Sequence, residues 1–414
     1  MTSFLARNPV TGKLEEILAL SNSDAFGRQR VSDPETLFEM NHIYDKQSLY
    51  VEEVLTSGGT GTHLPNEAAV QMAVTTTVGS RVVRQTKRYF NYQAGKSLLV
   101  MLTGVLVNAT NTGVRSRIGF FDDASDKTVD SGGNGIFFEY SGGTVKIVKR
   151  SFISGSQVDT AISQGAWSES DQLDGTGPSG ITLDPTKAQI FWMDLEWLGV
   201  GTVRCGIVHN GEYITLHKFH HANNIASVYM TRASLPVRYE IQQITGAAAA
   251  SMKQICCTVI SEGGHPKTGR IFSRPRTTTV SINTTLLPII AIRLRAGYER
   301  AMLQLLSSDI LTTANQQLIY QVYYGATLTG GAWVAHDATN SGVEYNISAT
   351  AISGGRLIDS GYVGSVNRQS TFELDAFDQA GVSIAGVPET ITLAGLATGA
   401  GTTTYGSLTW QEMY

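Results

Sequence analysis

Apolar and polar residues alternate along most of the chain after residue 35, and this period of two predicts β-strands rather than helices. The runs end at glycine, asparagine or aspartate, which are the residues that favour turns between antiparallel strands. The strands predicted in the first part of the chain occupy residues 69–78, 97–107, 114–121, 135–140, 143–150, 190–197, 203–208, 237–241 and 252–260. The run 97–107 is mostly apolar, which indicates a strand buried on both faces.

Two turn sequences predict β-hairpins. Asn210-Gly211 stands between two alternating runs, and both positions of such a pair accept the positive φ of a type I′ turn. Ser141-Gly142-Gly143 carries a similar signal. About nine strands with few helical windows predict a large antiparallel sandwich of jelly-roll type over residues 36–265.

A glycine-rich stretch at residues 263–269 predicts a domain boundary. Beyond it, strand-like runs occur at residues 276–282, 289–295, 301–306, 317–324, 370–375 and 408–414. They predict a second, smaller β-sandwich over residues 270–414, with 300–313 also compatible with a short helix. The expected fold class is therefore all-β.

Residues 1–35 differ from the rest of the chain because polar and turn-forming residues dominate. Asp24, Arg28 and Arg30 surround the single aromatic residue Phe26. Such a segment buries too little apolar surface to offset its ordering entropy, so we expect an extended arm that becomes ordered by docking on a neighbour.

Composition narrows the classes of partner. Charged residues make up 16% of the chain, against about 25% in ordinary soluble domains, which suits surfaces that become buried in an assembly. The net charge of −4 and the scattered basic residues, apart from 81–88, give no support for a nucleic-acid partner. No apolar run reaches the length of a membrane span, and the three cysteines lack metal-site spacing, so we expect no membrane insertion and reduced thiols.

The candidate chemical motifs all lack the context that their chemistry needs. The G-x-G-x-x-G match at 175–180 has no strand before it and no helix after it, so we interpret it as a loop. A histidine group consists of His209, His217, His220 and His221. A zinc site needs three or four ligands at fixed geometry, usually supported by a carboxylate or thiolate, so a solvated or core-satisfied histidine group is the simpler interpretation.

One carboxylate pair keeps an enzymatic alternative open. Asp194 and Glu196 bracket Leu195 on a predicted strand, so both face one side roughly 7 Å apart, a separation that could serve a glycosidase. Such pairs are common in strands, and Arg204 offers a simple charge partner. We therefore predict no catalytic, cofactor-binding or metal-binding residue and no enzymatic activity.

Aromatic residues offer a different kind of site, because their rings stack on the apolar faces of sugars. In the first domain Trp192 and Tyr213 are among the candidates, with core packing the default for at least half of its aromatic residues. In the C-terminal domain we predict a contact surface for a host glycan or another partner. It consists of Tyr320, Tyr323, Tyr324 and Trp333.

The segment Ser23-Asp-Ala-Phe-Gly-Arg-Gln-Arg-Val-Ser32 and several later segments resemble virion structural proteins of tailed bacteriophages. The later segments are 36–38, 83–97, 113–122, 173–181, 191–201 and 235–240, so the resemblance covers roughly residues 20–265. It implies a peripheral particle component, either a tail-fibre or baseplate-attached spike or a head-decoration protein. It also implies synthesis in the bacterial cytoplasm, other virion proteins as partners and a homo-oligomer, for which a trimer is favoured.

Three functions follow from these observations. The first is a virion protein that docks through its arm and presents its C-terminal domain. The second is a receptor-binding module that holds host surface glycans through that domain. The third is a polysaccharide-cleaving spike that uses Asp194 and Glu196.

Overall fold

The computed structural model of this 414-residue chain describes residues 3–7, 14–18, 33–126, 132–264, 269–313, 316–364, 369–373 and 379–414. The regular secondary structure of these residues consists of strands and three short 3₁₀ turns, at Pro65–Glu67, Ala124–Asp126 and Gln164–Ala166. The described residues contain no α-helix, and so no helix that could span a membrane. The all-β prediction is confirmed.

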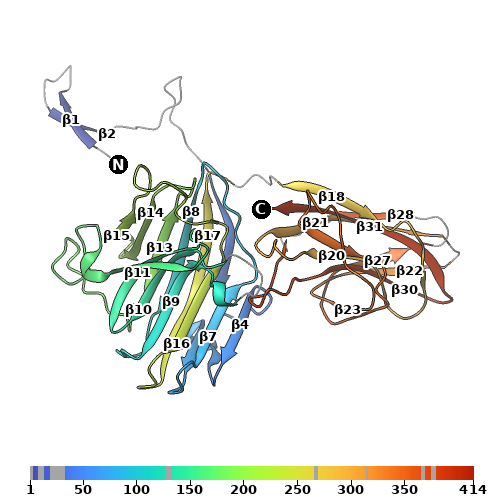
Figure 1. The fold of residues 1–414 in the computed structure, drawn as a ribbon, viewed down its shortest axis with the longest axis horizontal. Helices are drawn as coiled ribbons and strands as arrows, with labels where there is room; N and C mark the ends of the chain where they lie inside the picture. Colours follow the sequence, from blue (N-terminus) through green and yellow to red (C-terminus); the bar gives the residue numbers. More distant parts are fainter. Residues whose placement is uncertain are drawn as a thin grey trace.

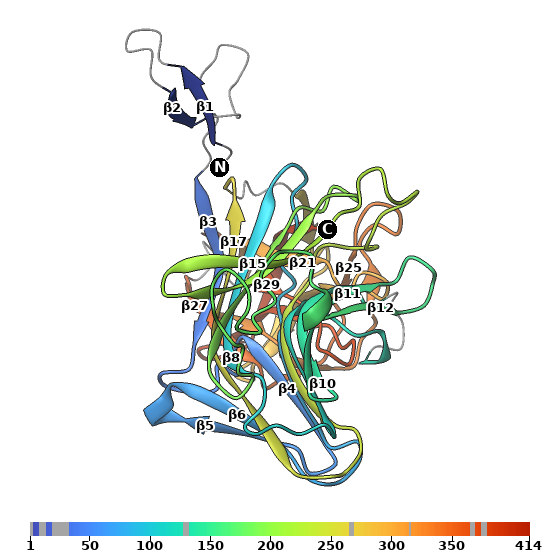
Figure 2. The same ribbon diagram turned by 90° about the vertical axis from the view of Figure 1, so that its left-hand side faces the viewer.

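The N-terminal arm is described only in part. Strands β1 (Ser3–Arg7) and β2 (Leu14–Leu18) pair antiparallel, and Figures 1 and 2 show this pair apart from both sandwiches. The four residues predicted to dock, Asp24, Phe26, Arg28 and Arg30, lie outside the described residues.

The large sandwich consists of two antiparallel sheets, on the left of Figure 1. The seven-stranded sheet has the order β12 (Val158–Ser163), β11 (Thr144–Ser151), β10 (Gly135–Ser141), β9 (Val114–Phe121), β16 (Val237–Gln243), β7 (Arg81–Thr86), β4 (Val51–Thr56). The eight-stranded sheet has the order β15 (Glu212–Phe219), β14 (Val203–His209), β13 (Gln189–Leu195), β8 (Ser97–Val105), β17 (Ala250–Glu262), β6 (Ala69–Val74), β5 (Thr60–Leu64), and β3 (Pro34–Asn41) also pairs with β17.

The core of the large sandwich is built from alternate residues of these strands. On β8, Leu98, Val100 and Leu102 are buried in it, whereas Leu99 and Met101 on the other face are only half-buried. The prediction that this run is buried on both faces was therefore wrong. The outer face of β8 remains partly open, and a pocket lies over it.

Both predicted hairpins are confirmed. Asn210 and Gly211 have φ values of 52° and 84° between β14 and β15, and Gly142 and Gly143 have 63° and 82° between β10 and β11. Positive φ at both central positions is the requirement of a type I′ turn, whose twist matches that of the strands.

The second sandwich has its own core. One six-stranded sheet contains β18 (Arg270–Pro275), β31 (Thr402–Met413), β21 (Met302–Thr312), β28 (Gln369–Glu373), β19 (Val280–Ile282) and β29 (Gln379–Ala380). The other has the order β24 (Val334–Ala335), β25 (Val343–Asn346), β20 (Leu287–Leu294), β30 (Ile391–Ala397), β22 (Leu318–Tyr324), β27 (Arg356–Val363). A separate two-stranded sheet pairs β23 (Thr327–Thr329) with β26 (Ala351–Ser353). Residues 302–312 are strand β21, paired along its length with β31, so the helical alternative for 300–313 was wrong.

The chain enters and leaves the large sandwich at one end. Pro34 at the start of β3 pairs with Glu262 at the end of β17. Beyond this pair, the Gly264 amide donates to the Asp33 carbonyl at 2.7 Å, and Lys96 Nζ donates to the Gly264 carbonyl at 2.7 Å. The segments leading to the arm and to the second sandwich are therefore tied together.

Candidate functional site

An open pocket of about 400 Å³ lies on the outer face of the eight-stranded sheet. We call it the outer-face pocket, and it is lined by Leu99, Trp192, Asp194, Arg204, Tyr213, Thr215 and Glu262. Trp192 and Asp194 are two residues apart on β13 and so share a face, while Phe191 and Met193 point into the core. The strand register then places Asp194 between Leu99 of β8 and Arg204 of β14.

The aromatic part of the pocket depends on a glycine. Gly206 lies opposite Trp192, and a Cβ at position 206 would lie 2.7 Å from atoms of the indole. Without that Cβ the indole can lie over β14, and its Nε1 donates to the Ile207 carbonyl at 3.0 Å. Tyr213 meets Trp192 edge to face with ring centroids 5.6 Å apart, and it is 53% exposed. A fixed indole thus supports a tyrosine ring that is open to solvent.

Asp194 is the polar centre of the pocket. It is only 6% exposed, and its Oδ2 accepts hydrogen bonds from Nε of Arg204 at 2.9 Å and from Nη2 of the same side chain. Its Oδ1 is buried and has no hydrogen-bond partner among the described residues. Burial raises the pKa of Asp194 above its ordinary value, although Arg204 acts in the opposite direction. The ionised carboxylate is therefore less well stabilised here than in water.

The second carboxylate of the pocket is not the one that the sequence suggested. Glu196 follows the end of β13, is exposed, and is not among the residues that line the pocket. Glu262 of β17 lines it instead, and its Oε2 accepts a hydrogen bond from Ser97 Oγ at 2.8 Å. Glu262 was missed because only the pairing of β17 with β8 brings it near Asp194.

The histidines form packing contacts rather than a ligand set. His221 stacks on Tyr229 with ring centroids 4.0 Å apart, and Nδ1 of His217 accepts the Ser168 amide at 2.9 Å. Burial lowers the pKa of His217 and of His221. Among the described residues, no group of three histidine, cysteine or acidic side chains is arranged to hold a metal ion.

The predicted aromatic surface of the second sandwich is not one surface. Tyr320 and Tyr324 are 3% and 7% exposed and belong to the hydrophobic core, so the expectation that they form a contact surface was wrong. The reason is the period of two, which turns alternate residues of β22 inward. Tyr323 on the other face is half-buried. Trp333 lies next to β24, which three strands separate from β22, and the guanidinium of Arg293 lies 4.1 Å from the centre of its ring.

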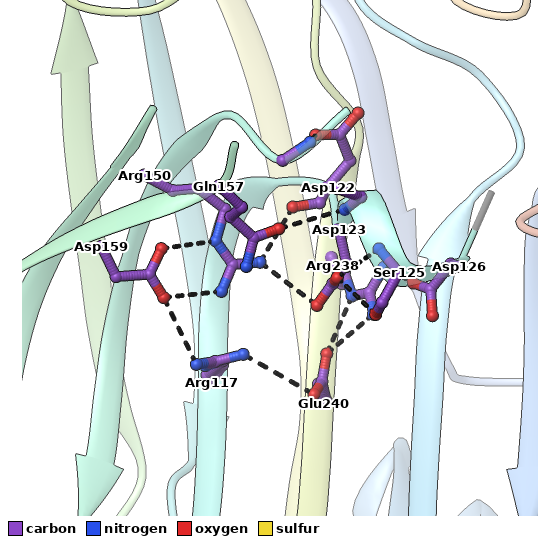
Figure 3. A network of polar contacts seen from close by, with 12 residues as sticks. Arg117, Asp122, Asp123, Ser125, Asp126, Arg150, Gln157, Asp159, Arg238 and Glu240 are labelled. Atoms are coloured by element: carbon purple, nitrogen blue, oxygen red, sulfur yellow. Dashed lines mark hydrogen bonds and ion pairs between the residues drawn. The ribbon is translucent and has the colours of Figure 1, made fainter. Parts of the chain in front are cut away.

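A network of buried ion pairs covers the outer face of the seven-stranded sheet (Figure 3). We call it the arginine network, and it includes Arg117, Arg150, Arg238, Asp122, Asp123, Asp126, Asp159 and Glu240. Arg150 binds both carboxylate oxygens of Asp159 at 2.8 Å, and Arg238 donates to Glu240 at 2.8 and 3.0 Å and to Asp126 at 2.7 Å. The bidentate pair of Arg150 with Asp159 fixes geometry as well as charge, whereas both nitrogens of Arg238 donate to the single oxygen Oε2 of Glu240.

The network is also held by ring contacts and by strong electrostatic coupling. The guanidinium of Arg150 lies 5.6 and 5.0 Å from the ring centroids of Phe121 and Phe137. Although burial acts in the opposite direction, Arg238 and further arginines hold the pKa of Glu240 well below its ordinary value. The arginines therefore favour the ionised form of Glu240 inside the network.

One residue of the second sandwich completes the arginine network. Arg300 donates from Nε to Asp122 Oδ2 at 2.5 Å, and both side chains are almost fully buried. Asp122 Oδ1 accepts the amides of Gly133 and Asn134 at 3.0 Å each. A second link joins the Ile384 amide to Glu52 Oε2 at 2.5 Å. A buried ion pair and a partly buried hydrogen bond thus fix the second sandwich on the first, and no sequence pattern indicated them.

Comparisons with known proteins add a likeness of fold. No protein-family model and no curated protein matches the sequence. Among solved structures, Bacillus licheniformis β-glucanase is similar over 56% of this chain and 99% of its own, with 9% identity and a TM-score of 0.35. A protein of unknown function from Shewanella oneidensis MR-1 shares 12% identity over 58% of this chain and 91% of its own, with a TM-score of 0.35. Peanut lectin in complex with a 9mer peptide shares 10% identity over 56% of this chain and 98% of its own, with a TM-score of 0.32. At such identities the likeness concerns the fold alone and indicates no activity or ligand for this chain.

Proposed function

We propose that this chain is a non-enzymatic structural component of a tailed-bacteriophage particle. It docks through its N-terminal arm and presents its C-terminal sandwich for assembly or host binding at the tail, the baseplate or a fibre. The observation that carries the proposal is the resemblance of residues 20–265 to virion structural proteins, beginning with the segment 23–32. A homo-oligomer, with a trimer favoured, is part of the same proposal.

The joint between the sandwiches supports this role. A component that holds a distal domain away from a particle needs a fixed angle between its parts. The buried contact of Arg300 with Asp122 and the partly buried hydrogen bond of Ile384 to Glu52 meet that need.

An exposed apolar segment next to β3 also supports a contact with a neighbour. Tyr44 is 88% exposed and Leu49 is 59% exposed, and Ile43 and Tyr50 are about half exposed. Apolar side chains that gather on a surface in this way mark sites of protein association more often than scattered single residues do.

Deletion of residues 1–32 tests the docking arm, because β3 and both sandwiches remain. We expect the shortened protein to fold with an unchanged circular dichroism spectrum and to be absent from purified particles. Particles with the alanine variant of Tyr362, which is 76% exposed on β27, serve as the matched control and keep full occupancy. Full occupancy of the deletion variant would refute docking through the arm, and gold-labelled antibodies on particles would distinguish the tail position from the alternative of head decoration.

Polysaccharide cleavage is the second candidate function. The observation that favours it is that Asp194 and Glu262 line one pocket, where burial shifts the pKa of Asp194 upward, the direction that suits a general acid. Purified protein incubated with the capsule or lipopolysaccharide of the host would release reducing ends, and a lack of release would end this candidate.

A further inference from the structure

We propose that the outer-face pocket of the large sandwich binds a neutral saccharide without cleaving it. The site is separate from the C-terminal sandwich, where the sequence had suggested glycan contacts. Saccharide binding by these pocket residues does not depend on the proposed place of the chain in a particle.

The apolar side of the pocket suits a sugar ring. Tyr213 exposes about half of its surface, and Trp192 supports it from below through an edge-to-face contact. A pyranose presents C–H groups on one face and hydroxyls at its rim, so it can stack on a flat aromatic ring while its hydroxyls reach polar neighbours. Leu99 extends this apolar area toward β8.

The polar side of the pocket offers both kinds of hydrogen-bonding group. Arg204 donates, Asp194 and Glu262 accept, and Thr215 does both. Sugar hydroxyls also donate and accept, so one ligand can satisfy the whole set. The buried Oδ1 of Asp194 is the strongest pointer, because a buried acceptor without a partner costs free energy that a hydroxyl donor would recover.

The same groups disfavour other ligands. A phosphate or other anion would meet two carboxylates, Asp194 and Glu262. A metal ion would find no third acidic or histidine ligand, since no such group of three occurs in the described part of the chain. A simple cation would have to compete with Arg204, which already binds Asp194.

The pocket is also formed before any ligand arrives. Its residues come from five paired strands. The indole of Trp192 donates a hydrogen bond to the Ile207 carbonyl and packs directly over Gly206, which has no side chain. A site on a rigid sheet loses little conformational entropy on binding, which favours recognition of a flexible oligosaccharide.

The test is titration calorimetry of the full chain with five probes: cellohexaose, maltohexaose, laminarihexaose, chitohexaose and the cationic chitosan hexamer. We expect at least one of the four neutral probes to bind with a Kd below about 1 mM. Tyr213→Ala and Asp194→Asn should each weaken that binding about tenfold or more, and Tyr362→Ala, which removes an exposed tyrosine elsewhere, should leave it unchanged. Thermal unfolding of each variant confirms that the fold is retained.

Four outcomes overturn the proposal. These are no binding of any neutral probe at about 10 mM, equal affinity of the Tyr213→Ala and Tyr362→Ala variants, binding of the chitosan hexamer alone, and accumulation of reducing ends that Asp194→Asn abolishes. The last outcome would assign the pocket to cleavage. None of the four affects incorporation into particles, so failure here and failure of the virion role can be told apart.

Discussion

Arg300→Met is the sharpest test of how the two sandwiches are joined. Methionine keeps much of the aliphatic stem but removes the guanidinium that donates to Asp122 at 2.5 Å. The Asp122 carboxylate, 1% exposed, then remains buried with a charge partner lost. Removing one partner of a buried pair costs about 3–5 kcal/mol. Because the amides of Gly133 and Asn134 still bind Oδ1, we expect the lower end, about 3 kcal/mol.

Urea unfolding followed by tryptophan fluorescence measures this loss. The matched control is Lys87→Ala, since Lys87 pairs across the same joint with Glu389 at 3.8 Å but both side chains are about a third exposed. An exposed pair of this kind contributes at most about 1 kcal/mol. If Arg300→Met lowers the free energy of unfolding by less than 1 kcal/mol, or by no more than Lys87→Ala does, the joint does not depend on the buried pair.

Three further predictions concern packing and pH. In Gly206→Ala the added Cβ would lie 2.0 Å from the Ile214 carbonyl oxygen and 2.7 Å from the indole of Trp192. The variant should therefore lower the free energy of unfolding by about 1–3 kcal/mol and shift the fluorescence of Trp192, and an unchanged urea midpoint would contradict this. Because the pKa of Glu240 is depressed in the fold, its ionised carboxylate stabilises the fold above pH 4.5, the ordinary pKa, and this stabilisation is lost as the pH falls further. Glu240→Gln should therefore flatten the acid limb of a curve of stability against pH, and parallel curves for the variant and the wild type would speak against it. Burial lowers the pKa of His42 from 6.5 to about 4, so its neutral form stabilises the fold above pH 6.5. Between pH 6.5 and 4 the free energy of unfolding of the wild type should fall by about 2 kcal/mol more than that of His42→Gln, as measured by urea titration at each pH.

The parts of the fold that depend on local chemistry could be predicted from the sequence. The Asn210-Gly211 turn is one example, because its two positive φ values are a property of those residues. Strand β21 is the opposite case, since an apolar run of that length fits a helix or a strand until its pairing with β31 decides. The half-open face of β8 is another, because the strand composition does not say what covers each face.

The candidate sites follow the same division. Asp194 was found because it lies on a strand of clear pattern, whereas Glu262 reaches the pocket only through the order of β17, β8 and β13 in the sheet. The burial of Tyr320 and Tyr324 did have a signal, namely the polar Gln321 between the apolar positions of β22. Arg300 had none, because the contact of the two sandwiches is a property of tertiary structure.

The shared end of β3 and β17 has a mechanical consequence. Tension between the N-terminal arm and the second sandwich enters the large sandwich where Pro34 pairs with Glu262. Two antiparallel strands pulled apart from the same end open like a zipper, with their hydrogen bonds broken in succession rather than together in shear. The strand pair β3–β17 would therefore yield at a low force once the contacts of Arg300 and Ile384, which also join the two sandwiches, have broken. A pulling experiment with handles at residues 33 and 264, which bypasses the second sandwich and its joint, should record this opening as an early, small extension that precedes the rupture of the large sandwich.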